Sequence, residues 1–363
     1  MMGENPCVRR ADTMPQSFDS LADLMAHGFD TVIDVRSPAE FAEDHVPGAI
    51  NLPALSNDQR AEVGTIYKQV SAFNARKIGA ALVARNVADH VEGPLAAYDG
   101  AWQPLVYCWR GGQRSGSFAS ILQQIGWRAD TIKGGYQTYR KLVHDAMYID
   151  PLPHRLVLLD GYTGTAKTAL LHLLAERGVQ IIDLEGLAAH RGSLLGGVAG
   201  GQPAQKGFES QLAQALAQLD PDKLTVVEAE SSKVGQIVLP KQIWARMSAA
   251  PRIEVKAPLA ARAAFLLEAY ADIIADPVLL RERLQPLRNL RGHTIVDGWE
   301  ELLNASDFNG LATALMDQHY DAAYARSRKV SDRTWLGEVH AMALDASGRA
   351  QAADDLAKLI ATL

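Results

Sequence analysis

Two short glycine-rich loops, each preceded by an apolar strand candidate, constrain the fold of this chain most strongly. The first loop, residues 108–115 (CWRGGQRS), follows the apolar run Pro104–Tyr107. The second, residues 161–168 (GYTGTAKT), follows Arg155–Leu159. Strands that lead through such loops into helices build parallel sheets, and ligands usually bind at the carboxyl ends of those strands. We therefore predict an α/β fold with a site at each loop.

The alternation of strands and helices restarts after a proline-rich segment, Asp150–His154, and we place a domain boundary there. The expected domains are residues 1–148, which carry Cys108, residues 149–258, which carry the second loop, and a mainly helical region, residues 259–363. Strands are expected at 31–35, within 47–52, and at 104–107, 155–159, 179–184, 224–228 and 252–255. Helices are expected at 75–85, 169–176, 260–270, 278–290 and 307–325.

Composition indicates a globular chain and excludes several classes of protein. Of 363 residues, 48% are hydrophobic and 21% are charged, which argues against disorder. No apolar run approaches the ~20 residues that cross a bilayer, and residues 1–16 lack the apolar core of a signal peptide. We therefore expect a cytoplasmic protein without membrane contact. A net charge of −6 neither supports nor excludes RNA binding.

The cysteine loop has the features of a site that stabilises a sulfur anion. Gly111 and Gly112 let successive backbone N–H groups point inward, and Arg110 and Arg114 add positive charge. The helix that begins near Arg114 directs its N-terminal amides toward the same point. We therefore predict that the pKa of Cys108 is lowered, and that Cys108, Arg110 and Arg114 are catalytic.

The second loop matches the phosphate-binding pattern G-x-x-x-x-G-K-[ST] except at one position. Backbone amides of such a loop wrap the phosphates, the lysine neutralises them, and the hydroxyl can hold a magnesium ion. Ala166 replaces the glycine before Lys167, which we expect to narrow the cradle or to change which phosphates fit. Thr168 is the candidate magnesium ligand, and no other metal ligand is predicted. The predicted phosphate- or diphosphate-binding residues are Gly161, Thr163, Gly164, Thr165, Ala166, Lys167 and Thr168.

Two further segments carry polar side chains after strand candidates. Glu228 and Glu230 lie where a nucleotide hydrolase keeps a metal ligand or a base. They would assist metal or substrate binding, or they would simply be solvated at the strand end. In the loop at 183–193, His190, Arg191 and Ser193 would contact substrate or tRNA by binding a phosphate or a base edge. The alternative is a capped helix start with a solvated arginine.

The first domain resembles the rhodanese family of sulfurtransferases. The resemblance rests on residues 34–41 (DVRSPAEF), residues 45–51 (HVPGAIN), the cysteine loop and Gly134-Gly135, and it covers roughly residues 15–145. In that family the loop cysteine carries a persulfide, so the resemblance implies this role for Cys108. Asp34 and Arg36 resemble scaffold residues rather than catalytic ones.

Nearly the whole chain resembles the tRNA 2-selenouridine synthase family, which joins a rhodanese domain to a P-loop domain in this order. Besides the two loops, the resemblance rests on residues 183–193 (DLEGLAAHRGS), 202–209 (QPAQKGFE), 228–231 (EAES) and 319–324 (HYDAAY). It implies that wobble 2-thiouridine in the anticodon of tRNA is S-geranylated from geranyl diphosphate and then converted to 2-selenouridine. Selenophosphate would supply the selenium. Both donors would be co-substrates, no tightly bound cofactor is implied, and magnesium is the one candidate ion.

Contact with tRNA is expected from arginines and aromatic side chains, because unpaired bases are read by stacking and by hydrogen bonds to their edges. Trp109 would stack on the target base or fill a gap in the core. Another group of candidates lies in a helical stretch that would either face phosphates or form an ordinary amphipathic helix. These candidates are Arg281 and Arg288, with their neighbours Arg283, Arg291, His293 and Trp299.

Two other functions compete with this hypothesis. A P-loop ATPase or kinase with a rhodanese-like sulfurtransferase domain would turn over ATP in a reaction that depends on Lys167. A non-enzymatic sulfur carrier or RNA-binding module would bind its ligand without producing a modified nucleoside, and the pairing of the two loops argues against it. The two cysteines, Cys7 and Cys108, are too few for a disulfide framework. Cys7 would be an incidental thiol or a resolving partner of Cys108, and neither the oligomeric state nor the set of tRNAs follows from the sequence.

Overall fold

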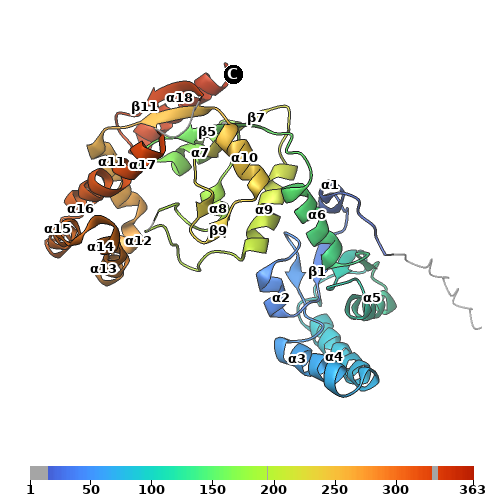
Figure 1. Ribbon diagram of the computed structural model, residues 1–363. Coiled ribbons are helices and arrows are strands. Elements are labelled where there is room, and N and C mark those ends of the chain that lie inside the picture. The colour runs from blue at the N-terminus through green and yellow to red at the C-terminus, as the bar shows by residue number, and fades with distance from the viewer. Residues whose placement is uncertain (1–14, 194, 329–333) are drawn as a thin grey trace, which may run out of the picture. The chain divides into compact units, whose positions relative to one another are not determined.

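The computed structural model describes residues 15–193, 195–328 and 334–363, which form two compact units (Figure 1). The first unit extends to Asp150 and also includes Ala204–Ala217, whereas the second comprises Pro151–Pro203 and Gln218–Leu363. The domain ranges predicted from the sequence did not include this return of the chain to the first unit. Cys7 lies outside the described residues, so its role stays a prediction.

The first unit is built on a parallel sheet of strand order β2-β1-β3-β4. Its strands are β1 (Thr31–Asp34), β2 (Ile50–Asn51), β3 (Pro104–Tyr107) and β4 (Asp130–Thr131). The two central strands are buried, with Ile33 of β1 opposite Val106 of β3, as is typical of a parallel sheet covered on both faces. Because β3 ends at Tyr107, Cys108 lies at the carboxyl edge of the sheet, as predicted.

Helices α3 and α4 form a hairpin in the first unit (Figure 1). The hydroxyls of Ser56 and Ser71 accept hydrogen bonds from amides in the first turns of α3 and α4, which satisfies donors that a helix start leaves free. Within this hairpin, only residues 75–85 were predicted to be helical. Helix α3 buries none of its residues, so it lacks the apolar periodicity that marks a helix in a sequence. The helices of this unit are α1 (Leu21–Met25), α2 (Pro38–Glu43), α3 (Asn57–Gln69), α4 (Ala72–Glu92), α5 (Gln113–Ile125), α6 (Tyr136–Tyr148) and α9 (Gln205–Ala217).

Helix α9 packs against α6 and α1 of the first unit. Glu209 of α9 is buried, pairs with Arg140 and accepts a hydrogen bond from the Tyr148 hydroxyl at 2.7 Å. Lys206 pairs with Glu43 at 2.7 Å on the surface. A buried carboxylate is tolerated only when it is paired and hydrogen-bonded, so these contacts explain how a helix far along the chain is held in this unit.

The second unit is built on a parallel sheet of order β11-β10-β5-β7-β6. Helices α7 (Lys167–Glu176) and α18 (Ala346–Ile360) pack together, and Leu170 and Leu356 belong to the same apolar core as the sheet. The last strand was not predicted, because it lies in the region expected to be helical. The strands are β5 (Arg155–Asp160), β6 (Gln180–Ile182), β7 (Leu224–Glu228), β10 (Arg252–Lys256) and β11 (Trp335–His340), with a separate hairpin of β8 (Lys233–Val234) and β9 (Ile237–Val238).

A group of helices follows β10 and has its own apolar cluster around Trp299, which is 1% exposed. The predicted helix at 278–290 is interrupted at Pro286, where a short 3₁₀ turn intervenes because proline lacks the amide that an α-helix needs. None of the described helices is long and apolar enough to cross a membrane. The helices of the second unit besides α7 and α18 are α8 (Leu184–Leu187), α10 (Lys241–Ala249), α11 (Leu259–Ala269), α12 (Ala271–Ile274), α13 (Pro277–Leu284), α14 (Arg288–Arg291), α15 (His293–Asn304), α16 (Phe308–Leu315) and α17 (Ala322–Arg328), the last two joined by a π-helical stretch, Met316–Asp321.

Candidate functional site

Cys108 lies directly after β3 and is only 4% exposed. The backbone N–H of Gly112 and the hydroxyl of Ser115 both donate hydrogen bonds to its Sγ atom, at 3.3 and 3.2 Å. Ser115 is buried in the first turn of α5, so the helix start holds the hydroxyl against the sulfur. The amide donors were anticipated from the glycines of the loop. The hydroxyl donor was not anticipated, although a serine seven residues after the cysteine could have indicated it.

These donors lower the pKa of Cys108. Burial by itself raises the pKa, because it removes water from the thiolate. The hydrogen bonds from the Ser115 side chain and from the backbone amides of Ser115, Gly112 and Arg110 outweigh burial, so the pKa lies below that of an ordinary thiol. The direction agrees with the prediction. The cause is the set of hydrogen-bond donors around the sulfur.

The arginines of the cysteine loop lie in different surroundings. Arg114 has its Nη1 atom 3.1 Å from Glu40 Oε2, and Arg60 has its Nε atom 2.9 Å from the same oxygen. Arg110 is exposed and forms no ion pair within the described part of the chain. Trp109 is partly buried, with its ring centroid 5.2 Å from that of Tyr136. The catalytic and base-stacking roles of these residues stay predictions.

Gly135 lets the chain close behind the cysteine loop. Its φ angle is +59°, in the region that favours glycine. A β-carbon at this position would overlap the carbonyl oxygen of Cys108 and the amide nitrogen of Gly111. The amide of Tyr136 donates to the same Cys108 carbonyl at 2.8 Å. The closing segment therefore fixes the direction in which Cys108 leaves β3.

The phosphate loop connects β5 with α7, as predicted. Ala166 adopts φ +58°, a left-handed conformation that glycine would adopt with less strain. Its methyl group is buried in the core of the second unit, which offsets part of that strain. Lys167 donates from Nζ to the carbonyl oxygen of Gly161 at 2.9 Å. The departure from the phosphate-loop pattern therefore leaves the strand–loop–helix geometry intact.

A polar pocket of about 310 Å³ adjoins the phosphate loop. Loop residues 163–168 line it together with side chains that include Glu185, Arg191, Ser193 and Glu230. Thr168 Oγ1 donates to Glu185 Oε2 at 2.8 Å. The Nη1 atom of Arg191 is buried and has no hydrogen-bond partner among the described residues, so it is a donor that an anion would satisfy. The structure thus brings Arg191, Ser193, Glu230 and Glu185 to the phosphate loop. The sequence motifs had not indicated that these segments meet there.

Two acids near this pocket, the buried Glu228 and the partly buried Glu230, hold their protons more tightly than ordinary carboxyls. Burial and the neighbouring Glu185 raise the pKa of Glu230 to about 8, against the lowering effect of Lys167. Burial and Asp183 raise the pKa of Glu228 well above its usual value. Glu228 is 0% exposed, and its Oε1 accepts the backbone N–H of Glu185 at 3.0 Å. Glu228 is therefore not a solvated strand end, and the pocket is less negative at pH 7 than its composition suggests.

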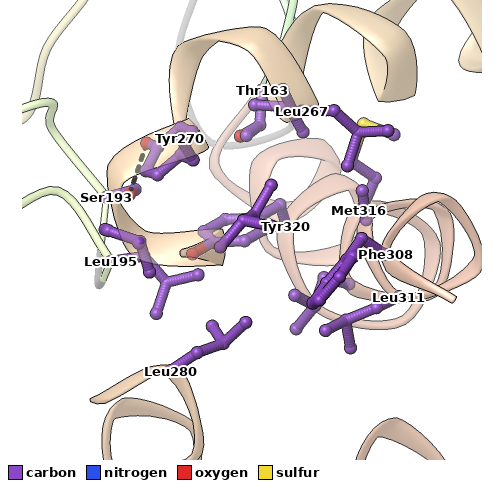
Figure 2. A pocket seen from close by; sticks show the side chains of 15 residues that line it. Thr163, Ser193, Leu195, Leu267, Tyr270, Leu280, Phe308, Leu311, Met316 and Tyr320 are labelled. Carbon is purple, nitrogen blue, oxygen red and sulfur yellow. Dashed lines mark hydrogen bonds between the residues drawn. The ribbon is translucent and has the colours of Figure 1, made fainter. Parts of the chain in front are cut away.

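A second, apolar pocket lies among the helices of the second unit (Figure 2). It adjoins the polar pocket. The two pockets share Thr163, Ser193, Leu266, Tyr270 and Tyr320. The hydroxyls of Ser193 and Tyr270 lie 2.8 Å apart and are hydrogen-bonded to each other. No sequence pattern indicated this pocket, because its walls come from the helices α11, α12, α13 and α16, the π-helical stretch and two loops. Beyond the shared residues it is lined by Leu195, Leu267, Ile273, Ile274, Leu280, Phe308, Leu311, Ala312, Leu315 and Met316.

The two arginines predicted to contact tRNA in the helical part make internal contacts. Arg281 donates to Asn304 Oδ1 at 2.7 Å. Arg288 pairs with Asp297 at 2.6 Å and with Glu300 at 3.1 Å. These contacts join α13 and α14 to α15. A role of these arginines in tRNA contact stays a prediction. His190, the remaining candidate, accepts the Gly192 amide at Nδ1, 3.2 Å away, and burial lowers its pKa.

Models of two protein families match the chain in the order expected. A model described as a rhodanese-like domain matches residues 17–142, and one described as the tRNA 2-selenouridine synthase AAA domain matches residues 154–283. The cysteine loop therefore lies in a rhodanese-like domain and the phosphate loop in the AAA domain. Together with the two parallel sheets, these matches confirm the predicted fold class.

Several curated tRNA 2-selenouridine synthases are similar to this chain. The protein of Nitrosomonas europaea is 34% identical over 258 residues, which cover 70% of this chain and 66% of that relative, just under two thirds. The protein of Nitrosomonas eutropha is 33% identical over 303 residues, covering 82% of this chain and 76% of the relative. For Cronobacter sakazakii the identity is 38% over 268 residues, with coverage of 72% and 69%. On this similarity and the matching domain models, the chain belongs to the tRNA 2-selenouridine synthase family.

Proposed function

We propose that the protein modifies tRNA at a wobble 2-thiouridine in two steps. The first is S-geranylation from geranyl diphosphate, and the second is replacement of the geranylated sulfur by selenium from selenophosphate, which yields 2-selenouridine. The names of the similar proteins support the class of reaction. The observation that carries the proposal is the continuity of the polar pocket at the phosphate loop with the apolar pocket, because a prenyl diphosphate needs both in one site.

In the first step, the sulfur of 2-thiouridine bonds to C1 of the geranyl group, the C1–O bond breaks, diphosphate departs, and the base loses its N3 proton. Lys167, the amides of the phosphate loop and Arg191 stabilise the departing diphosphate. This role requires electrostatic stabilisation and no activated water. The unsatisfied Nη1 atom of Arg191 supports it.

Thr168 and Glu185 are the residues that would hold a magnesium ion, since their oxygens lie 2.8 Å apart beside the loop. Such an ion would neutralise phosphate charge when bound. Among the residues that the structure describes, no three His, Cys, Asp or Glu side chains form a metal-binding group. Most ligands of the ion would therefore come from the diphosphate and from water.

The geranyl chain would occupy the apolar pocket. Its aliphatic and aromatic lining offers few hydrogen bonds, which suits a hydrocarbon better than the base of a nucleotide. The enclosed volume is about 60 Å³, less than a ten-carbon chain occupies. Binding therefore requires lining side chains to rotate, and Met316 is suited to this because methionine is unbranched and flexible.

The second step is assigned to the cysteine loop. Selenium from selenophosphate bonds to C2 of the base, the C2–S bond breaks, and geranyl thiol is released. The P–Se bond of selenophosphate also breaks, and water supplies the oxygen that replaces selenium in the released phosphate. The donors around Cys108 stabilise an anionic chalcogen. They support a role for Cys108 in holding selenium during this exchange.

Mass spectrometry of nucleosides tests both steps on the full chain, incubated with 2-thiouridine tRNA, geranyl diphosphate and then selenophosphate. Lys167→Ala should lose the geranylated product, and Cys108→Ser should keep it while losing the selenated one. Leu267→Trp, which fills the apolar pocket from a partly buried position, should also lose geranylation.

The matched control is Leu290→Trp, because Leu290 is 67% exposed and does not line the pocket. Its yield of geranylated nucleoside should equal that of the unmodified chain. If Leu267→Trp retains full geranylation, the prenyl group does not bind in the apolar pocket. Turnover of ATP that depends on Lys167, without any geranylated product, would instead support the ATPase or kinase.

A further inference from the structure

A large groove lies between the α3–α4 hairpin and the cysteine loop. Its volume is about 1120 Å³, more than the roughly 300–1,000 Å³ of pockets that enclose a small molecule. Residues of α3 and α4 form one part of its lining, and Arg110, Gln113, Arg114 and Ser117 form the other. The groove therefore opens beside the loop that holds Cys108. It belongs entirely to the first unit.

The lining of this groove is strongly cationic. In a chain of net charge −6 it contains no carboxylate. Arg60 and Arg114 share the carboxylate of Glu40, which does not line the groove and is 12% exposed. The other three cations form no ion pair with any residue in the described ranges, so their charge is available to a polyanion. The five cations of the lining are Arg60, Lys68, Arg76, Arg110 and Arg114.

The hairpin adds exposed aromatic rings to these cations. Tyr67 lines the groove and is 58% exposed. Phe73, at the start of α4 and outside the lining, is 69% exposed. Unpaired bases stack on such rings, and cations beside them contact the phosphates between the bases. The segment 67–76 (YKQVSAFNAR) thus interleaves aromatic and basic side chains. An apolar protein partner would not require the unpaired cations, so the combination favours single-stranded RNA.

We infer that this groove binds the phosphates of the tRNA anticodon loop and so presents the wobble base to the Cys108 loop. The identity of the RNA rests on the proposed function, whereas the binding of a single-stranded polyanion rests on the groove itself. A selenophosphate ion is far smaller than the groove and would leave the hairpin cations unused. The inferred tRNA-binding surface thus lies in the first unit. It combines Arg110 and Arg114 of the cysteine loop with hairpin side chains that no sequence motif marked.

Fluorescence anisotropy of a labelled anticodon stem-loop containing 2-thiouridine tests this inference. The variant is Lys68→Glu/Arg76→Glu, and both side chains are exposed, so folding should be unaffected. The matched control is Lys77→Glu/Arg85→Glu, which makes the same change of charge at exposed positions of α4 outside the groove. Loss of two phosphate contacts should raise the Kd for the stem-loop at least tenfold. It should also reduce the magnitude of the slope of log K against log salt concentration by about 1.4, because each phosphate of a single strand contributes about 0.7. Alkylation of Cys108 at an unchanged rate confirms that the loop is intact.

The outcomes separate this inference from the proposed function. Affinity that falls in the groove variant and not in the control supports the inference, even if no modified nucleoside forms and the proposed function fails. Equal losses in both variants, or no binding by the unmodified chain, would overturn it. If the groove variant binds RNA like the control while the unmodified chain still makes selenated nucleoside, the inference fails alone.

Discussion

Replacing Ser115 by alanine should raise the pKa of Cys108. The Ser115 hydroxyl donates to Cys108 Sγ at 3.2 Å in a buried site. A hydrogen bond to a charged group contributes about 1.5–3 kcal/mol, and one pKa unit corresponds to about 1.4 kcal/mol. Loss of this bond should therefore raise the pKa by about 1–2 units. The Gly112 amide, 3.3 Å from Sγ, still donates in the variant and keeps part of the stabilisation.

The assay is the rate at which iodoacetamide alkylates Cys108 as a function of pH, followed by mass spectrometry of the Cys108 peptide so that Cys7 is counted separately. Only the thiolate reacts, so the rate rises with pH through the pKa. In Ser115→Ala this rise should move to higher pH, and below both midpoints the rate should fall about 10- to 100-fold. The control is Ser120→Ala, an exposed position on the same helix. An unchanged midpoint in Ser115→Ala would refute the reasoning, because the thiolate would then be stabilised without the hydroxyl.

Three further predictions concern the remaining features of the two loops. Gly135→Ala should lower the free energy of unfolding by about 3 kcal/mol or more, because its β-carbon overlaps the Cys108 carbonyl; denaturant unfolding that matches the unmodified chain would contradict this. Ala166→Gly should change the free energy of unfolding by less than about 1 kcal/mol. Relief of about 1–2 kcal/mol of backbone strain is offset by the greater entropy of glycine in the unfolded chain and by the loss of a buried methyl group. A larger change in either direction would contradict this balance. Affinity for inorganic diphosphate, measured by calorimetry, should weaken as pH rises through about 8, because Glu230 is neutral below that pH and negatively charged above it. Glu230→Gln should remove this pH-dependent loss of affinity. A loss that persists in the variant would assign the titration to another group.

Much of the fold was predictable from local patterns. The apolar runs before Cys108 and Gly161 became β3 and β5, and the loops after them became the two candidate sites. Each strand, its loop and the following helix are contiguous in the sequence, so the hydrogen bonds of the loop and the helix join residues that are close along the chain. Helix α3 was missed because it buries no residue. Strand β11 was missed because it follows a long helical region and is a strand only through its pairing with β10.

Each candidate site likewise has parts that the sequence predicted and parts that only the structure revealed. The glycines, Cys108 and Lys167 were identified from the sequence, because a loop that wraps an anion uses the amides and side chains of a few consecutive residues. The position of Arg191 at the phosphate loop, the apolar pocket and the cationic groove depend on segments far apart in the chain. Their assembly is decided by how helices pack, since packing depends on the shapes of apolar side chains that no short motif records. The sequence by itself thus determined where the two glycine-rich loops lie, each directly after a strand. The tertiary structure decided which surfaces surround them.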